Sequence, residues 1–269
     1  MKKLYLLPLL AIAACSAPHK ASQTGTTSNS SVVLDGKLWA SVFQQKAAEY
    51  KALCFQAYNI AQLRLQQALQ QPSAKPLAVV TDIDETLLDN SPNAVHQVLQ
   101  GKDYETKAWM EWTARAEADT LAGASTFFNY AAANKVEVFY ITNRDEQEKA
   151  ATILNLKKFG FPYADDAHVI MRQPNTSSSK ESRRQNVSAT HNIVLLLGDN
   201  LGDFSMLFDK KTSTERVQNV QSNAAEFGKR FIVLPNVTYG DWESSMYQYN
   251  YKLTNAQKDS AAKSGLRNY

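Results

Sequence analysis

Four aspartates stand in two short clusters that could hold a divalent cation. Asp82 and Asp84 lie two residues apart, and Asp199 and Asp203 lie four residues apart, directly after Gly198. Carboxylates gathered in one cleft resist ionising together unless a cation neutralises them. A site with a few oxygen ligands and room for water and phosphate oxygens suits Mg²⁺. The two clusters therefore predict a magnesium site that also accepts phosphate.

Other polar side chains follow short apolar runs in the same way. Thr142, Asn143 and Arg144 come directly after the apolar run that ends at Ile141, and Lys180 follows three serines at the expected start of a helix. Hydroxyl, amide and ammonium groups of this kind can bind a phosphoryl group. The chemistry requires a fold that brings these distant segments to one edge.

The apolar pattern predicts such a fold. Short apolar runs typical of buried parallel strands alternate with segments of helical periodicity, which indicates a doubly wound, mainly parallel α/β sheet. The expected strands are 77–81, 136–141, 167–170, 193–197 and 231–234, and the expected helices between them are 123–134, 145–159, 178–187 and 204–227, the last with a break. Ligands of such sheets bind at the carboxyl ends of the strands, which is where the polar groups stand.

Two further segments complete the expected domain, which spans residues 32–269. Apolar residues recur at helical spacing over 38–71, which predicts a long N-terminal helix or a helical pair. The stretch of about 90–121 is too long for an ordinary connection and has its own helical pattern around Trp109, Met110 and Trp112, so it predicts a small helical cap. Cys54 lies on the apolar stripe of the N-terminal segment, where a small buried side chain is expected.

The first thirty residues have the pattern of a segment that directs export and membrane attachment. Residues 1–14 have Lys2 and Lys3, then a short apolar run and small residues, as in a secretory signal. Small residues directly precede Cys15, which resembles the lipobox of bacterial lipoproteins. That resemblance implies acylation of Cys15, a membrane anchor, and sorting to the outer membrane because Ser16 follows. Residues 15–31 then form a polar, flexible tether.

Composition and charge exclude several classes of protein. Of 269 residues, 44% are apolar and 20% are charged, and the mean hydropathy is −0.39, which fits a folded domain without several membrane spans. The formal charge is +3, and removing Lys2 and Lys3 with the signal leaves 27 basic against 26 acidic side chains. So small an excess argues against a nucleic-acid partner. The two cysteines exclude a multi-cysteine zinc site.

The segments 82–90 and 198–204 together resemble the paired signature of class C bacterial acid phosphatases, the DDDD lipoproteins of the haloacid dehalogenase (HAD) superfamily that include lipoprotein e 5′-nucleotidases. The resemblance implies that Asp82 is the nucleophile and forms an aspartyl phosphate, and that Asp84 acts as general acid and base. It implies that Mg²⁺ is held by Asp82, the backbone carbonyl of Asp84 and Asp199, with Asp203 orienting its waters. Thr142, Asn143 and Lys180 would bind the phosphoryl group.

The resemblance also suggests a substrate. In the nucleotidase branch, aromatic residues that match Trp109 and Tyr239 form two walls around a base, which implies nucleoside 5′-monophosphates, including nicotinamide mononucleotide, as substrates. Two alternatives stay open at this point: a broad acid phosphatase acting on aryl and sugar phosphates, and a haem-binding or adhesive surface lipoprotein. The expected partners are small phosphate monoesters and, through the lipid, a membrane; a homodimer is left open.

Overall fold

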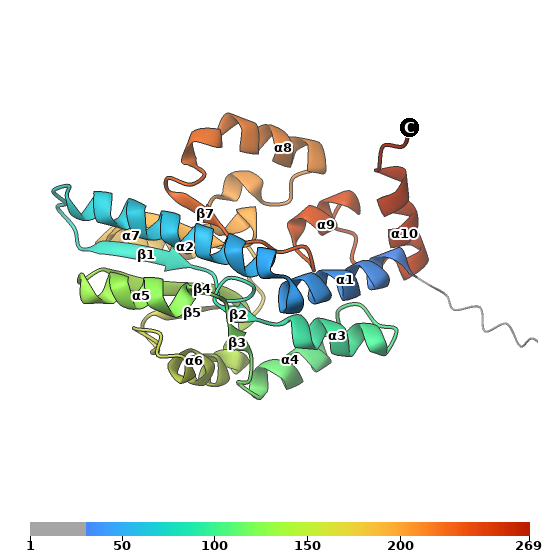
Figure 1. Cartoon of the computed structure of the whole chain (residues 1–269), viewed down its shortest axis with the longest axis horizontal. Helices are drawn as coiled ribbons and strands as arrows, with labels where there is room; N and C mark the ends of the chain where they lie inside the picture. Colours follow the sequence, from blue (N-terminus) through green and yellow to red (C-terminus); the bar gives the residue numbers. More distant parts are fainter. Residues whose placement is uncertain (1–30) are drawn as a thin grey trace, which may run out of the picture.

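The computed structural model describes residues 31–269, so the signal segment, Cys15 and nearly all of the tether lie outside the described residues. A parallel five-stranded sheet forms its centre (Figure 1). The strands are β1 (Leu77–Thr81), β4 (Glu137–Asp145), β5 (Val169–Arg172), β6 (Asn192–Gly198) and β7 (Phe231–Val233), in the spatial order β5-β4-β1-β6-β7. The predicted α/β fold class is confirmed, and β1 keeps its predicted bounds.

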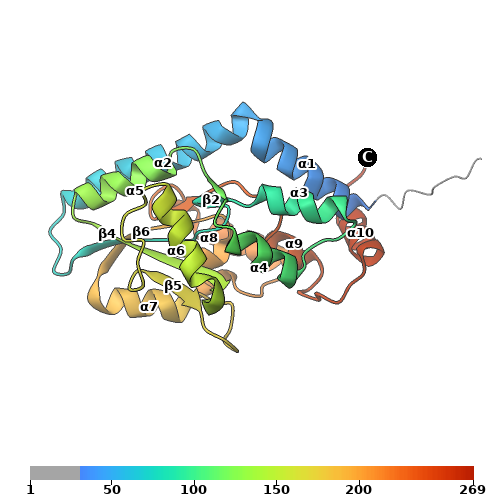
Figure 2. The same ribbon diagram turned by 90° about the horizontal axis from the view of Figure 1, so that it is seen from below.

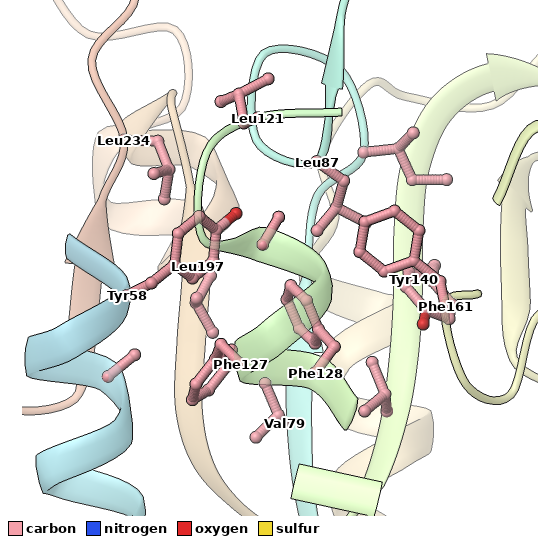
Figure 3. Close-up of a cluster of buried hydrophobic side chains, with 14 of the residues drawn as sticks. Tyr58, Val79, Leu87, Leu121, Phe127, Phe128, Tyr140, Phe161, Leu197 and Leu234 are labelled. Carbon is pink, nitrogen blue, oxygen red and sulfur yellow. The ribbon is translucent and has the colours of Figure 1, made fainter. Parts of the chain in front are cut away.

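Other elements cover both faces of the sheet. Successive residues along its strands are apolar, and therefore both faces carry side chains that must be buried. One core contains Val79, Val138 and Leu197, and the other contains Val80, Phe139 and Leu196, so neighbours along each strand enter opposite layers. The first layer includes α2 (Ala48–Leu69), α5 (Ala124–Ala133) and α6 (Lys149–Lys158), and its aromatic centre is drawn in Figure 3. On the second face, α7 (Glu181–Thr190) packs against β4 and β6.

The N-terminal segment is a helical pair and not one helix. α1 (Val32–Lys46) is followed by α2, and the extended backbone of Ala47, with ψ of 129°, separates them. Cys54 on α2 is fully buried, and burial raises the pKa of its thiol to about 11. Among residues 31–269, no helix combines the length and apolarity needed to cross a membrane.

The segment after β1 leaves the sheet and returns. It contains β2 (Leu88–Asp89), α3 (Ser91–Leu99), α4 (Thr106–Ala114) and β3 (Asp119–Thr120), and β2 pairs with β3 in antiparallel fashion where the segment returns. In Figure 2, α3 and α4 lie together with α1 at one end of the molecule, beyond the sheet. The helical segment expected over about 90–121 is therefore placed at the end of the fold where the strands point.

Several predicted boundaries differ from those observed. The predicted helix at 145–159 is shorter because β4 continues to Asp145 and a 3-10 turn (Glu146–Glu148) precedes α6. The predicted helix at 178–187 begins only after Lys180, and the segment 204–227 consists of Met206–Phe208, α8 (Ser213–Ser222) and Ala224–Glu226. The helices α9 (Asp241–Met246) and α10 (Asn255–Ser264) were not predicted; α10 is capped by the Thr254 side chain and packs against α1.

Candidate active site

The predicted chemical groups meet at the carboxyl edge of the sheet. Asp82 follows β1, Asn143 lies near the end of β4, and Asp199 follows β6. A cavity of about 400 Å³ opens beside them. Its lining includes every residue predicted for the site within residues 31–269 except Thr142, namely Asp82, Asp84, Trp109, Asn143, Lys180, Asp199, Asp203 and Tyr239. The fold thus joins residues that lie more than a hundred positions apart in the sequence.

Lys180 lies between two of the aspartates. Its Nζ is 2.5 Å from Oδ1 of Asp82 and 2.7 Å from Oδ1 of Asp203, and all three side chains are nearly buried. The second oxygen of Asp203 accepts a hydrogen bond from the Asn200 amide at 3.0 Å. A Cβ atom at Gly198 would lie 2.3 Å from that carboxylate, so a larger residue there would displace Asp203. Glycine at 198 is required by this close approach of the carboxylate.

Asp199 is supported from two sides. Its Oδ1 is 3.4 Å from the hydroxyl of Thr86, and its Oδ2 accepts a 2.7 Å hydrogen bond from the side chain of Asn236. The sequence did not single out Asn236, which lies in the loop after β7; the signal available was only its place after a strand end. These contacts fix the orientation of the Asp199 carboxylate.

The electrostatics of the cluster favour a bound cation. Carboxylate oxygens of Asp82, Asp199 and Asp203 lie within 4.8 Å of one another. Burial, together with the negative charges of Asp203 and Asp84, raises the pKa of Asp82 to about 7 although Lys180 lowers it. Burial and the same kind of repulsion raise the pKa of Asp199 well above its ordinary value. One lysine does not neutralise three converging carboxylates, so this all-oxygen donor set fits a hard divalent cation.

The carboxylate of Asp84 binds partners outside that cluster. Its carboxylate accepts hydrogen bonds from Asn90 Nδ2 at 2.8 Å and from Nη2 of Arg144 at 2.7 Å. The neighbouring Glu85 is buried and has a left-handed backbone (φ 53°), and it accepts the hydroxyl hydrogen of Tyr239 and the Asn90 amide hydrogen. The loop after β1 is thus held by hydrogen bonds at both acidic side chains, which counter the cost of the left-handed residue.

Thr142 and Asn143 lie beside the cavity at the end of β4. Thr142 is fully buried, and its hydroxyl accepts a hydrogen bond from the Arg144 amide at 3.1 Å. Arg183 donates to the Thr142 carbonyl at 2.5 Å and to Oδ1 of Asn143 at 2.6 Å. Arg183 therefore fixes the strand end that carries both predicted phosphate-binding residues, a role that the sequence did not assign to it.

Aromatic side chains line the cavity from α4, from the loop before α4 and from the loop before α9. Trp109 lies on α4, and Tyr239 lies in the loop before α9 with its hydroxyl bound to Glu85. Tyr104 also lines the cavity, with its ring centroid 6.3 Å from that of Trp109, and the sequence did not single it out. Trp112 plays a different part, since its Nε1 donates to Oδ1 of Asn90 at 2.8 Å. Flat apolar surface and the carboxylates thus share one cavity.

Comparison with known proteins agrees with this geometry. A family model described as HAD superfamily, subfamily IIIB (acid phosphatase), matches residues 12–242. The structure of the class C acid phosphatase from Bacillus anthracis is 42% identical, superposes with a TM-score of 0.85, and covers 88% of this chain and 99% of its own. The crystal structure of that phosphatase with tungstate bound is also 42% identical, with a TM-score of 0.84 and coverages of 88% and 98%.

Proposed function

The chain belongs to the acid phosphatases of HAD subfamily IIIB and is a phosphomonoesterase, and we propose that it hydrolyses nucleoside 5′-monophosphates in a Mg²⁺-dependent reaction. The observation that carries the choice of substrate is the shared cavity. Trp109, Tyr104 and Tyr239 line the same 400 Å³ cavity as Asp82 and Asp84. A base that stacks on an aromatic ring gains about 1–3 kcal/mol.

Asp82 is the proposed nucleophile. Lys180 binds its Oδ1, which leaves Oδ2 to attack phosphorus and form an aspartyl phosphate while the bond from phosphorus to the leaving oxygen breaks. The ammonium group of Lys180 also offsets negative charge on the phosphoryl group as it is transferred. The strand end at Thr142 and Asn143, fixed by Arg183, is the proposed binding site for the other phosphoryl oxygens.

Asp84 is the proposed general acid and base. In the first half-reaction it gives a proton to the oxygen of the leaving nucleoside, and in the second its carboxylate takes a proton from the water that attacks phosphorus. Water then releases phosphate and regenerates Asp82. One residue serves both halves because each half leaves it in the protonation state that the next half requires.

The family's divalent metal fits the donor set described above. Asp82, Asp199 and the backbone carbonyl of Asp84 would hold it, and Asp203, whose two oxygens already bind Lys180 and Asn200, would orient its waters. When bound, such an ion neutralises the clustered carboxylates and polarises a phosphoryl oxygen. That the ion is Mg²⁺ is part of the proposal, supported by the all-oxygen ligands.

A panel of phosphate esters tests the substrate. Values of kcat/KM are measured with Mg²⁺ for 5′-AMP, nicotinamide mononucleotide, ribose 5-phosphate and phenyl phosphate, and again with EDTA. We expect nucleotides to exceed ribose 5-phosphate at least tenfold, and EDTA to abolish turnover. Equal values for nucleotides, sugar phosphates and aryl phosphates would instead support a broad acid phosphatase. Activity that survives EDTA would overturn the metal dependence.

Attachment to the outer membrane is a separate proposal. It is supported by the lipobox-like residues around Cys15 and by the polar composition of the sequence between Cys15 and α1. Several acyl chains on one cysteine make an anchor nearly permanent, at about 0.8 kcal/mol for each buried CH₂. Expression in a bacterium followed by membrane fractionation tests it: the wild type should sediment with outer membranes, and Cys15→Ser should not. Equal distribution of both proteins would refute the anchor.

A further inference from the structure

Arg144 contacts three other elements beside the cavity. It is the second-last residue of strand β4, is 3% exposed, and lines the cavity. Its Nη1 donates to the hydroxyl of Thr152 on α6 at 2.9 Å, and its Nε and Nη2 reach Asp84. Its guanidinium carbon lies 5.7 Å from the ring centroid of Trp109 on α4. Arg144 on β4 therefore contacts α6, the loop after β1 and α4.

The contacts distinguish the two oxygens of Asp84. Oδ1 accepts three hydrogen bonds: from Asn90 Nδ2 at 2.8 Å, from Arg144 Nη2 at 2.7 Å and from Arg144 Nε at 3.1 Å. Within residues 31–269, Oδ2 receives one longer contact, from Arg144 Nε at 3.2 Å. The carboxyl group is thus held by Oδ1, and Oδ2 is the oxygen left with free lone pairs for a proton or a ligand.

We propose that Arg144 is a positioning residue that holds Asp84 with Oδ2 toward the leaving oxygen. The inference rests on the proposed function, because the orientation of Oδ2 matters only if Asp84 protonates the leaving group. The planar guanidinium suits this role, since its fork binds the carboxylate at two nitrogens while its carbon lies over the Trp109 ring. The ammonium of lysine has a single nitrogen and cannot bind the carboxylate in this two-pronged way. Arg144 thus contacts both Trp109, the ring proposed to stack on a base, and Asp84, the acid proposed to protonate the nucleoside.

Two substrates with different leaving groups separate positioning from structural support. The nucleoside leaving from 5′-AMP departs as an alkoxide and needs a proton, whereas the phenolate leaving from 2,4-dinitrophenyl phosphate does not. We expect Arg144→Lys to lower the pre-steady-state rate of nucleoside release from 5′-AMP, which reports the first half-reaction alone, by roughly 10- to 100-fold, because a misplaced catalytic group costs that much. The same variant should keep the pre-steady-state rate of phenolate release from 2,4-dinitrophenyl phosphate within about threefold, which also shows that the protein is folded. Hydrolysis of the aspartyl phosphate, in which Asp84 acts as base, is common to both substrates and should slow equally for both.

Controls make the comparison strict. Arg172→Lys makes the same change in another arginine–aspartate pair, with Asp145 on the neighbouring strand and outside the cavity, and should alter neither rate. In an Asp84→Asn background, Arg144→Lys should cause no further loss with 5′-AMP, because its effect passes through Asp84. If Arg144→Lys slows leaving-group release from both substrates by the same factor, or adds its full effect to Asp84→Asn, the assignment is wrong.

The proposed function can fail separately. If the wild type hydrolyses sugar phosphates and not 5′-AMP, the nucleotide preference is refuted, and ribose 5-phosphate then takes the place of 5′-AMP as the alkoxide substrate in the same comparison. If Asp84→Asn leaves the alkoxide rate intact, the role of Asp84 and the positioning role of Arg144 both fall.

Discussion

Replacing Lys180 by methionine tests how the carboxylates are kept together in the metal-free protein. Lys180 lies 2.5 Å and 2.7 Å from Asp82 and Asp203, with side-chain exposures of 6% for the lysine and 11% and 5% for its partners. At an effective dielectric constant of about 20, each pair attracts by about 6 kcal/mol before desolvation is counted. Breaking a buried pair costs about 3–5 kcal/mol in stability, since it leaves an uncompensated charge.

The assay is equilibrium urea unfolding near pH 8 in EDTA, where Asp82, whose pKa is about 7, is mostly ionised. Lys180→Met should lower the free energy of unfolding by about 3 kcal/mol and the melting temperature by roughly 6–12 °C. Lys157→Met, the same change at an exposed position on α6, should stay within about 0.5 kcal/mol of the wild type.

A second substitution separates charge from packing. Adding Asp82→Asn to Lys180→Met removes one of the uncompensated carboxylates, so the double variant should recover at least half of the lost stability while remaining inactive. Adding Mg²⁺ to Lys180→Met should recover stability as well, because a cation replaces the missing charge. If the single and double variants are equally unstable, loss of lysine packing is the cause, and the electrostatic reasoning is refuted.

Three further outcomes follow from the geometry. Gly198→Ala should lower kcat at least tenfold by displacing Asp203. Gly36→Ala, a control in open space on α1, should not change kcat. An unaltered kcat in Gly198→Ala would contradict the close approach of the Asp203 carboxylate to Gly198. In EDTA, the free energy of unfolding of the wild type minus that of Asp82→Asn should fall as the pH rises from about 4 to 7. The reason is that the raised pKa of Asp82 makes the folded state bind more protons than the unfolded state. An increase of this difference with pH would contradict the reasoning. Burial alone would raise the pKa of Asp103, but Lys37 and Lys258 hold it below its usual value. Asp103→Asn should therefore destabilise the protein at pH 7, and this effect should be lost progressively as the pH falls below the ordinary aspartate pKa of about 4. Calorimetry across that range checks it, and a cost independent of pH would exclude the charge as the cause.

The sequence predicted the sheet because its signals are local. Buried parallel strands such as β1 and β6 are continuous apolar runs, and polar residues follow each at the next position. Strand ends of a doubly wound sheet meet at one edge, so the meeting of Asp82 with Asp199 could be foreseen. The break between α1 and α2 could not be fixed, because the apolar periodicity continues through Ala47 and only its extended backbone separates the helices.

What the sequence could not supply was the set of partners between distant segments. Arg144 and Asp84 are 60 positions apart, and Lys258 binds Asp103 across 155 positions. The residues next to Arg144 in the sequence do not indicate whether it binds a surface carboxylate or a catalytic one. The same holds for Tyr104, which lines the cavity because the segment with α3 and α4 lies at the end of the molecule beyond the sheet.

The proposed mechanism depends above all on Asp82 carrying the phosphoryl group during turnover of a nucleotide. Acid quenching of the enzyme during hydrolysis of 5′-AMP, followed by mass spectrometry of its peptides, measures this directly. We expect phosphate on the peptide that contains Asp82, and neither phosphate nor turnover in Asp82→Asn. Full turnover of 5′-AMP by Asp82→Asn, or phosphate trapped on a different residue of the wild type, would contradict the mechanism.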